Sequence, residues 1–260
     1  MTAYPRTRRD DTTETLHGRE VADPYRWLED PGSDETRTWV AEQNRLSRGH
    51  LDRLASRPWF HRTMTAIVGR PHAGTPDKVG GRYVVSRNDG AQQQDVWFVA
   101  DTLDELRQGG RLLLDPNTFS EDGTSSLAGY NASEDGRWLA YLVSDGGSDW
   151  ITIRLLDIDG GHEVVDTVSK AKFSEATWLP DHSSYLYVHY PTDGAGLGTE
   201  AAALPGGRLK RHRVGESQDG DELVLEFPEN PRLGMSPELS HDGRLLVVQL
   251  HEGTSEKNRL

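Results

Sequence analysis

A tight turn that leads into an apolar strand recurs along most of this chain and restricts the folds open to it. The turn positions fall at Gly81, Gly136, Ser183 and Gly243, which are 47 to 60 residues apart. The fullest copy is NASEDGRWLAYLVSDGGSDWITIRLLDIDGG, and shorter copies are TWLPDHSSYLYVHY and ELSHDGRLLVVQLHEG. A four-stranded blade of a β-propeller takes roughly 40–50 residues. The repeat therefore predicts antiparallel blades that stack on one another, with a β-sandwich of similar strands as the alternative.

Short apolar runs bounded by Gly, Asp, Asn or Ser follow Pro71 and predict strands. They are RYVVS, DVWFVA, RLLLD, RWLAYLVS, WITIRLLDID, SYLYVHY, ELVLEF and RLLVVQL. Roughly 190 residues follow Pro71, enough for about four blades. The fourth copy stops as it enters its second strand, and an open propeller leaves unpaired strand edges. We therefore expect residues 72–260 to form an incomplete β-propeller domain, and the sequence to be an N-terminal fragment of a longer chain.

Residues 1–71 have a different texture and predict an N-terminal arm with two α-helices. The first part reads as extended and irregular, because Gly and Pro interrupt it repeatedly. Ser33 is a candidate N-cap for a helix over SDETRTWVAEQNRLSRGHLDRLA, whose first turn is acidic. Pro58 begins a second, shorter helix that Gly69 ends. The predicted fold class is thus mainly β, a partial propeller preceded by a helical arm.

The charge balance and composition exclude several classes of partner. The formal net charge is −13, whereas binding to nucleic-acid phosphates needs a surplus of Lys and Arg. No apolar run approaches the roughly 20 residues of a membrane span, and the N-terminus lacks an apolar signal segment. The chain has no cysteine, which excludes disulfides and thiolate sites. We expect no nucleic-acid partner, no membrane association and a cytoplasmic location.

No catalytic constellation is visible in the sequence. A nucleophile elbow needs Gly-x-Ser-x-Gly on a strand-to-helix turn, and the serines that come nearest lack the second glycine. These are Ser125, Ser148 and Ser255. The ten histidines have no metal-ligand spacing, so we expect no metal and no cofactor. We therefore assign no catalytic residue in this chain.

One segment near the start, DPYRWLED, has neither a helix nor a strand period, yet it concentrates aromatic and charged residues. With its flanks, YPRTRRDDTTETLHGREVADPYRWLEDPGSDETRTWVAEQN, it resembles the opening of the prolyl oligopeptidase family of serine peptidases. The likeness continues through LDPNTFSEDGT, GYNASEDGRWLAYLVSDGGSDWITI, KFSEATW, EFPENP and ELSHDGR. It covers essentially the whole chain.

The resemblance implies a seven-bladed propeller, of which about four blades fall in this chain, and an arm that belongs to an α/β-hydrolase domain. In that family the Ser, Asp and His of the catalytic triad follow the propeller, so they would lie outside this chain. A full-length relative would be a cytosolic serine endopeptidase that cleaves short peptides after proline, with the propeller gating access. The implied partners are short proline-containing peptides and the C-terminal hydrolase domain of the same full-length chain. The present chain alone is expected to be inactive.

The resemblance also implies four substrate-binding residues. Asp149, in GSDW, corresponds to an aspartate near the active-site cleft that influences a substrate-binding arginine of the hydrolase domain. Phe173, in KFSEATW, and Met235, in FPENPRLGM, match residues of an outer apolar subsite, although relatives more often read WMGG at the second position. Thr254 falls where a small or sulfur-bearing side chain can complete that pocket. The alternatives are turn capping for Asp149 and blade-core packing for Phe173 and Met235.

Two other functions remain open from the sequence. One is a related oligopeptidase that cleaves after basic residues, because the primary specificity pocket would lie outside this chain. The other is a non-catalytic propeller that binds peptides or proteins, against which the arm argues because a free-standing propeller needs none. Within DPYRWLED, Tyr25, Trp27 and Leu28 are expected to dock on the hydrolase domain, which predicts strong exposure of Trp27 in this chain.

Overall fold

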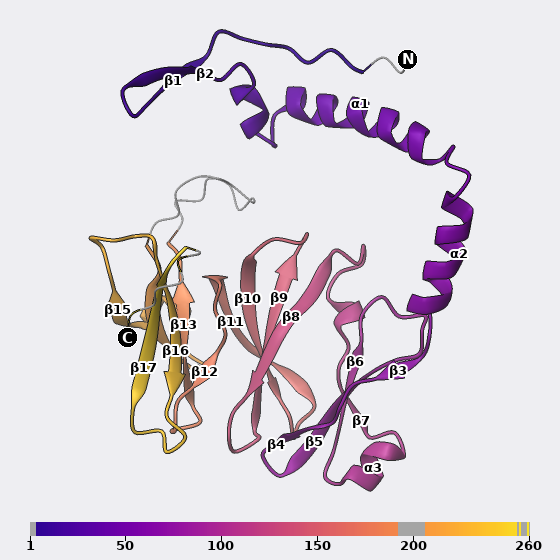
Figure 1. Cartoon of the computed structure of the whole chain (residues 1–260). Helices are drawn as coiled ribbons and strands as arrows, with labels where there is room; N and C mark the ends of the chain where they lie inside the picture. Colours follow the sequence, from indigo (N-terminus) through magenta and orange to yellow (C-terminus); the bar gives the residue numbers. More distant parts are fainter. Residues whose placement is uncertain (1–3, 192–205, 254, 256–258, 260) are drawn as a thin grey trace. The chain divides into compact units, whose positions relative to one another are not determined.

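The chain divides into two compact units, Met1–Gly69 and Arg70–Leu260. The structure, a computed structural model, describes residues 4–191, 206–253, 255 and 259 (Figure 1). The elements of the first unit are β1 (Thr13–Leu16), β2 (Arg19–Ala22), the 3-10 turn η1 (Arg26–Glu29), α1 (Asp34–Leu51) and α2 (Arg57–Val68). Among the described residues, no helix is both long and apolar enough to cross a membrane.

The arm contains both predicted helices and one element that was not predicted. The Ser33 hydroxyl caps α1, because it accepts a hydrogen bond from the backbone N–H of Thr36 at 3.2 Å. The segment before the helices was expected to be irregular, but β1 and β2 pair there as an antiparallel hairpin. The left-handed residues His17 and Gly18 make its tight turn, with φ of +52° and +76°.

DPYRWLED is held by contacts within the arm. The indole N–H of Trp27 donates to the carbonyl of Arg8 at 3.1 Å, and the Arg8 guanidinium lies 4.9 Å from the indole ring centroid. The carbonyl of Trp27 accepts a hydrogen bond from the Thr36 hydroxyl at 3.1 Å, which fixes the start of α1 against η1. Trp27 is therefore half-buried. The strong exposure predicted for it is wrong, because the arm itself covers part of the ring.

The described part of the second unit forms three antiparallel sheets, of five, eight and two strands (Figure 1). The eight-stranded sheet is continuous between β11 and β13 through a single residue pair, Ala171 and His189, and we divide it there to give blades 1 to 4 in chain order. Blade 1 contains β3 (His72–Ala73), β4 (Asp77–Val79), β5 (Arg82–Asn88), β6 (Val96–Ala100), α3 (Leu103–Arg107) and β7 (Arg111–Leu114). Blade 2 follows η2 (Pro116–Thr118) and contains β8 (Ser125–Ala132), β9 (Trp138–Asp145), β10 (Trp150–Asp157) and β11 (His162–Lys172). Blade 3 contains β12 (Thr177–Trp178), β13 (Ser184–His189), β14 (Arg208–Arg213), η3 (Gln218–Gly220) and β15 (Glu222–Glu226). Blade 4 contributes β16 (Leu233–Leu239) and β17 (Leu246–Glu252).

Both faces of the middle blades are buried, which identifies the fold as a partial β-propeller. Side chains alternate between the two faces of a strand. On β9, Leu139, Tyr141 and Val143 pack into an apolar core shared with blade 1, whereas Ala140 and Leu142 pack into one shared with blade 3. Strand β13 divides its side chains in the same way between the cores facing blades 2 and 4. The sandwich alternative fails because each sheet of a sandwich buries only one face in a shared core.

Side-chain hydrogen bonds join the inner strands of neighbouring blades. The indole N–H of Trp178, on β12, donates to the carbonyl of Asn131 on β8 at 3.0 Å. The hydroxyl of Thr177, also on β12, donates to the carbonyl of Pro237 on β16 at 3.1 Å. Blade 3 is thereby tied to both of its neighbours at its innermost strand.

The turn that opens each blade's long apolar strand allows neighbouring blades to approach closely. Gly80 and Gly136 have φ of +57° and +72°, a left-handed conformation that glycine adopts without steric cost. A Cβ atom on Gly136 would lie 3.0 Å from the Cα atom of Gly80, so the turns of blades 1 and 2 touch. A Cβ atom on Gly243 would similarly lie 2.5 Å from the ring of Pro180, between blades 3 and 4. Gly80, Gly136 and Gly243 therefore set the spacing between blades 1 and 2 and between blades 3 and 4, whereas Gly81, the predicted position of the first turn, meets no neighbouring atom.

We predict that Gly136→Ala destabilises the second unit by about 1–3 kcal/mol, because the new methyl group meets both a strained φ and the backbone of Gly80. The matched control is Gly81→Ala, where an added Cβ meets no atom within 4 Å and φ is not left-handed. The measurement is the free energy of unfolding in urea. Equal losses for the two variants would show that the turn contact does not set the blade spacing.

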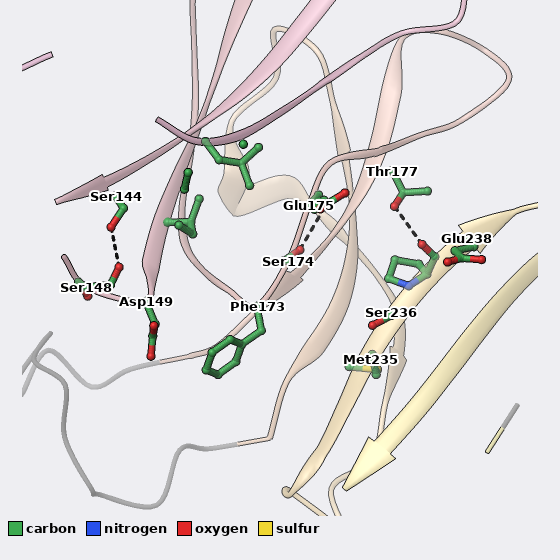
Figure 2. Close-up of a pocket in the computed structure, with 15 residues that line it drawn as sticks. Ser144, Ser148, Asp149, Phe173, Ser174, Glu175, Thr177, Met235, Ser236 and Glu238 are labelled. Atoms are coloured by element: carbon green, nitrogen blue, oxygen red, sulfur yellow. Dashed lines mark hydrogen bonds between the residues drawn. The ribbon is translucent and has the colours of Figure 1, made fainter. Parts of the chain in front are cut away.

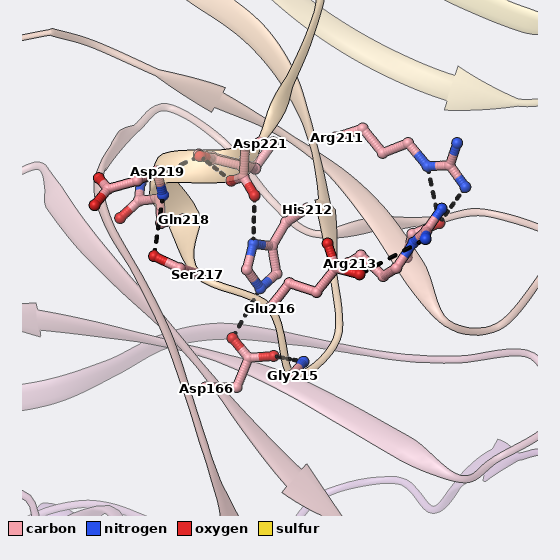
Figure 3. Close-up of polar contacts among 12 residues, drawn as sticks. Asp166, Arg211, His212, Arg213, Gly215, Glu216, Ser217, Gln218, Asp219 and Asp221 are labelled. Atoms are coloured by element: carbon pink, nitrogen blue, oxygen red, sulfur yellow. Dashed lines mark hydrogen bonds and ion pairs between the residues drawn. The ribbon is translucent and has the colours of Figure 1, made fainter.

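A buried polar network joins blades 2 and 3 (Figure 3). Nε2 of His212, on β14, lies 2.8 Å from a carboxylate oxygen of Asp166 on β11, and Nδ1 lies 2.8 Å from one of Asp221. Asp166 also accepts from the backbone N–H of Gly215 at 2.7 Å, and Asp221 accepts from the Tyr187 hydroxyl at 2.6 Å. Burial lowers the pKa of His212, but its hydrogen bonds to the two carboxylates outweigh burial and raise the pKa to about 9. The imidazolium thus serves as a charged link between two blades.

We predict that His212→Gln destabilises the protein by about 3–5 kcal/mol near pH 6, because two buried carboxylates lose their cation. The raised pKa makes the contribution of the imidazolium complete below the unfolded value of about 6.5 and progressively lost as the pH rises through about 9. The gap between wild type and variant should therefore narrow over that range in urea unfolding curves. A gap that is constant from about pH 6 to about pH 10 would contradict the charged link. His241→Gln, on an exposed turn, is the control.

Candidate functional site

A cavity of about 600 Å³ is formed by side chains of blades 2, 3 and 4 (Figure 2). Its walls come from β8, β9 and β10, from the segment that follows β11, and from β12 and β16. Asp149, Phe173 and Met235, three of the four predicted substrate-binding residues, line it. Thr254, the fourth, lies outside the described residues. In Figure 2, Asp149 and Phe173 lie together, and Met235 lies on β16 across the cavity.

Phe173 presents its ring to the cavity instead of to a blade core. It directly follows β11, and 61% of its surface is exposed. Its φ of +50° lies in the left-handed region, where a bulky side chain is strained. Core packing, the alternative considered from the sequence, does not describe this residue.

Met235 has a double position in the wall. Only 2% of its surface is exposed, and it belongs to the apolar core between blades 3 and 4 with Leu186, Val188 and Leu209. It also lines the cavity. Core packing therefore does describe Met235. The part of its side chain that lines the cavity belongs to a residue that also stabilises the fold.

Asp149 sits at the turn between β9 and β10, and serines hold that turn. The Ser144 hydroxyl donates to the carbonyl of Ser148 at 2.6 Å, and the Ser148 hydroxyl accepts from the backbone N–H of Trp150 at 3.1 Å. The Asp149 carboxylate is 59% exposed, and its Oδ2 lies 3.7 Å from Nζ of Lys172. The partner of the Asp149 carboxylate is thus the ammonium group of Lys172. The capping of the turn, which the alternative assigned to Asp149, is supplied by the Ser148 hydroxyl.

The cavity also contains charged groups that sequence reasoning missed. Glu175 and Glu238 join Asp149 in its lining, and the Glu175 carboxylate accepts from the Asn131 amide at 3.0 Å. Glu175 follows Phe173 by two residues, so proximity in sequence could have suggested it. Glu238 carries no such signal, because only the packing of β16 beside β12 brings it here. The cavity therefore combines an apolar ring with several carboxylates, a lining suited to orienting an organic ligand.

Two of the serines that come nearest to a nucleophile elbow in the sequence are engaged in local hydrogen bonds. The Ser125 hydroxyl donates to the Asp145 carboxylate, and the Ser148 hydroxyl is engaged in its turn. Among the residues that the structure describes, no group of three or more His, Asp or Glu side chains could hold a metal ion.

The fold and the cavity together define the class of protein, a β-propeller with a ligand-sized cavity among its blades. The family model for the prolyl oligopeptidase N-terminal β-propeller domain matches residues 5–260. The chain therefore belongs to the prolyl oligopeptidase family, within which it comprises the N-terminal propeller portion.

Individual relatives agree with this assignment. The chain is 32% identical to a prolyl endopeptidase of Elizabethkingia miricola over 97% of its own length and 35% of the relative's. It is 31% identical to prolyl oligopeptidase A of Amanita bisporigera, over 99% of this chain and 37% of that one. The chain thus spans about a third of the length of these curated relatives.

Solved structures show the same likeness. One, from a study of interdomain dynamics in two prolyl endopeptidases, matches with a TM-score of 0.86 and 30% identity over 98% of this chain and 37% of that one. Prolyl oligopeptidase B from Galerina marginata, bound to a 25mer macrocyclization substrate, matches with a TM-score of 0.84 and 28% identity over 98% of this chain and 38% of that one.

We predict different stability effects at the two apolar wall residues. Phe173→Gly should change the free energy of unfolding by less than about 1 kcal/mol, because relief of the strained φ offsets loss of the ring's contact with the Lys172 ammonium group. Met235→Ala should lower it by about 2–4 kcal/mol, because a buried side chain leaves a cavity. Urea unfolding of both variants provides the comparison. A large loss at Phe173 would show that its ring supports the fold.

Proposed function

We propose that this propeller works with an α/β-hydrolase domain in a serine endopeptidase that cleaves short peptides after proline. In this proposal the hydrolase domain supplies the catalytic Ser, Asp and His, and the propeller gates access to them. Membership of the prolyl oligopeptidase family supports the reaction type. The name shared by the relatives supports the preference for proline.

The observation that carries the propeller's part in this function is the cavity. Asp149, Phe173 and Met235 come from three separate segments of the chain and line one space of about 600 Å³. We propose that the exposed Phe173 ring and the edge of Met235 receive an apolar part of the bound peptide. In the same proposal, Asp149 faces the hydrolase domain and acts on the groups that hold the substrate. Thr254 belongs to this proposed subsite by its resemblance alone.

The proposed activity is tested with a chromogenic prolyl peptide. The full-length protein should hydrolyse it, whereas residues 1–260 alone should not, because the triad is proposed to lie beyond them. Hydrolysis by the pure 260-residue chain, or none by the full-length protein, would contradict the proposal.

The part played by the cavity is tested in the full-length enzyme with Phe173→Ala. We expect KM to rise about threefold to thirtyfold with kcat little changed, because the ring contributes binding area remote from the reacting bond. Leu112→Ala, which removes another exposed apolar side chain in blade 1, should leave KM unchanged. An unchanged KM for Phe173→Ala would show that the Phe173 side of the cavity takes no part in peptide binding.

A further inference from the structure

The end of β11 inverts the usual placement of charged and apolar side chains. Lys172 is 6% exposed, whereas the next residue, Phe173, is 61% exposed. Burial of an aromatic ring and hydration of an ammonium group both favour the opposite arrangement. Two residues here have a left-handed backbone conformation. They are Lys170, near the end of β11, with φ of +57°, and Phe173, directly after β11, with φ of +50°. The backbone is therefore held in a strained path that exposes the ring and buries the charge.

The buried ammonium group has defined partners. Nζ of Lys172 lies 5.1 Å from the ring centroid of Trp150 and 5.1 Å from that of Phe173, over the face of each ring. It also lies 3.7 Å from Oδ2 of Asp149. Cation–π attraction and the ion pair together hold the charge against the Phe173 ring. The Phe173 ring, which lines the cavity, thus already has the Lys172 ammonium group over one of its faces.

This cation changes what the exposed ring can attract. An aromatic face attracts cations through its quadrupole, but a cation already bound to the ring repels a second one across it. The other charged groups of the cavity lining are the carboxylates of Asp149, Glu175 and Glu238, which by themselves would attract a basic side chain. Lys172 counters that attraction, both across the ring and by pairing with Asp149.

We propose that Lys172 is a specificity-determining residue of this cavity, which disfavours Lys and Arg side chains of a bound peptide and favours apolar or aromatic ones. The proposal rests on the proposed function, because it requires that the cavity receives part of a peptide substrate. Lys172 acts through Phe173 and Asp149 and needs no contact with the reacting atoms.

The test uses the full-length enzyme and matched fluorogenic prolyl peptides that carry Leu or Lys at one position upstream of the proline. At the position that reaches the cavity, wild type should prefer Leu by kcat/KM. Lys172→Met should lower the Leu-to-Lys ratio about threefold to tenfold, mainly through KM, because the carboxylates are no longer countered. Lys172→Arg should keep the wild-type ratio, because it retains the charge.

Two further variants separate charge from packing. Asp149→Asn removes an exposed carboxylate and leaves Lys172 unopposed, so it should raise the Leu-to-Lys ratio. If Lys172→Met does not fold, Lys172→Gln, which removes the charge and keeps a polar end on the side chain, provides the test. Lys78→Met, which removes an exposed lysine from β4, should leave the ratio unchanged.

The outcomes distinguish this inference from the function on which it rests. A wild-type enzyme that cleaves none of the prolyl peptides would overturn both. An active wild type whose ratio is unchanged by Lys172→Met, or by Lys172→Gln where the first variant does not fold, would overturn the role of Lys172 alone.

Discussion

The structure depends on one constraint, that a sheet with two apolar faces must be covered on both sides. Strand β9 has six consecutive apolar residues and β13 has four, and on each strand these side chains alternate between two different cores. In this chain neighbouring sheets cover both faces of such strands, as the radial stacking of a propeller requires. The glycine turns and the hydrogen bonds between inner strands then fix how closely the sheets stack.

The same stacking creates the cavity. Strand edges and turns of blades 2, 3 and 4 come together to line it. Met235 belongs to both features, because it fills the core between blades 3 and 4 and also lines the cavity. Phe173 shows the opposite case, because its strained backbone and exposed ring contribute little to packing. Strain of this kind persists where the surrounding structure determines the backbone, and it is common at binding sites.

Much of the fold was predictable from the sequence because apolar strands and repeated turns leave local patterns. Strand β14, RLKRHR, was not predicted, since its composition is basic and it has a single apolar residue. It is a strand because β13 and β15 pair with it on both sides and because two carboxylates satisfy His212. The short helix α3 was also missed, although Thr102 and Glu105 form a capping box there.

The site was predictable only in part. Resemblance to a family identified Asp149, Phe173 and Met235, and the packing of blades explains why these distant residues line one cavity. Lys172 was missed because lysine is rarely buried and nothing in AKFSEATW indicates that the charge turns inward. Glu238 was missed because its position depends on the approach of a strand from another blade.

The central claim is that peptides enter the cavity between blades 2, 3 and 4 of this propeller. The most direct measurement is photo-crosslinking of the full-length protein with a prolyl peptide that carries benzoylphenylalanine upstream of the proline, followed by mass-spectrometric mapping of the adducts. The account predicts adducts within residues 173–175 and 235–238, which competing unlabelled peptide removes. Adducts confined to blade 1 or to the N-terminal arm, with none in these two segments, would contradict it.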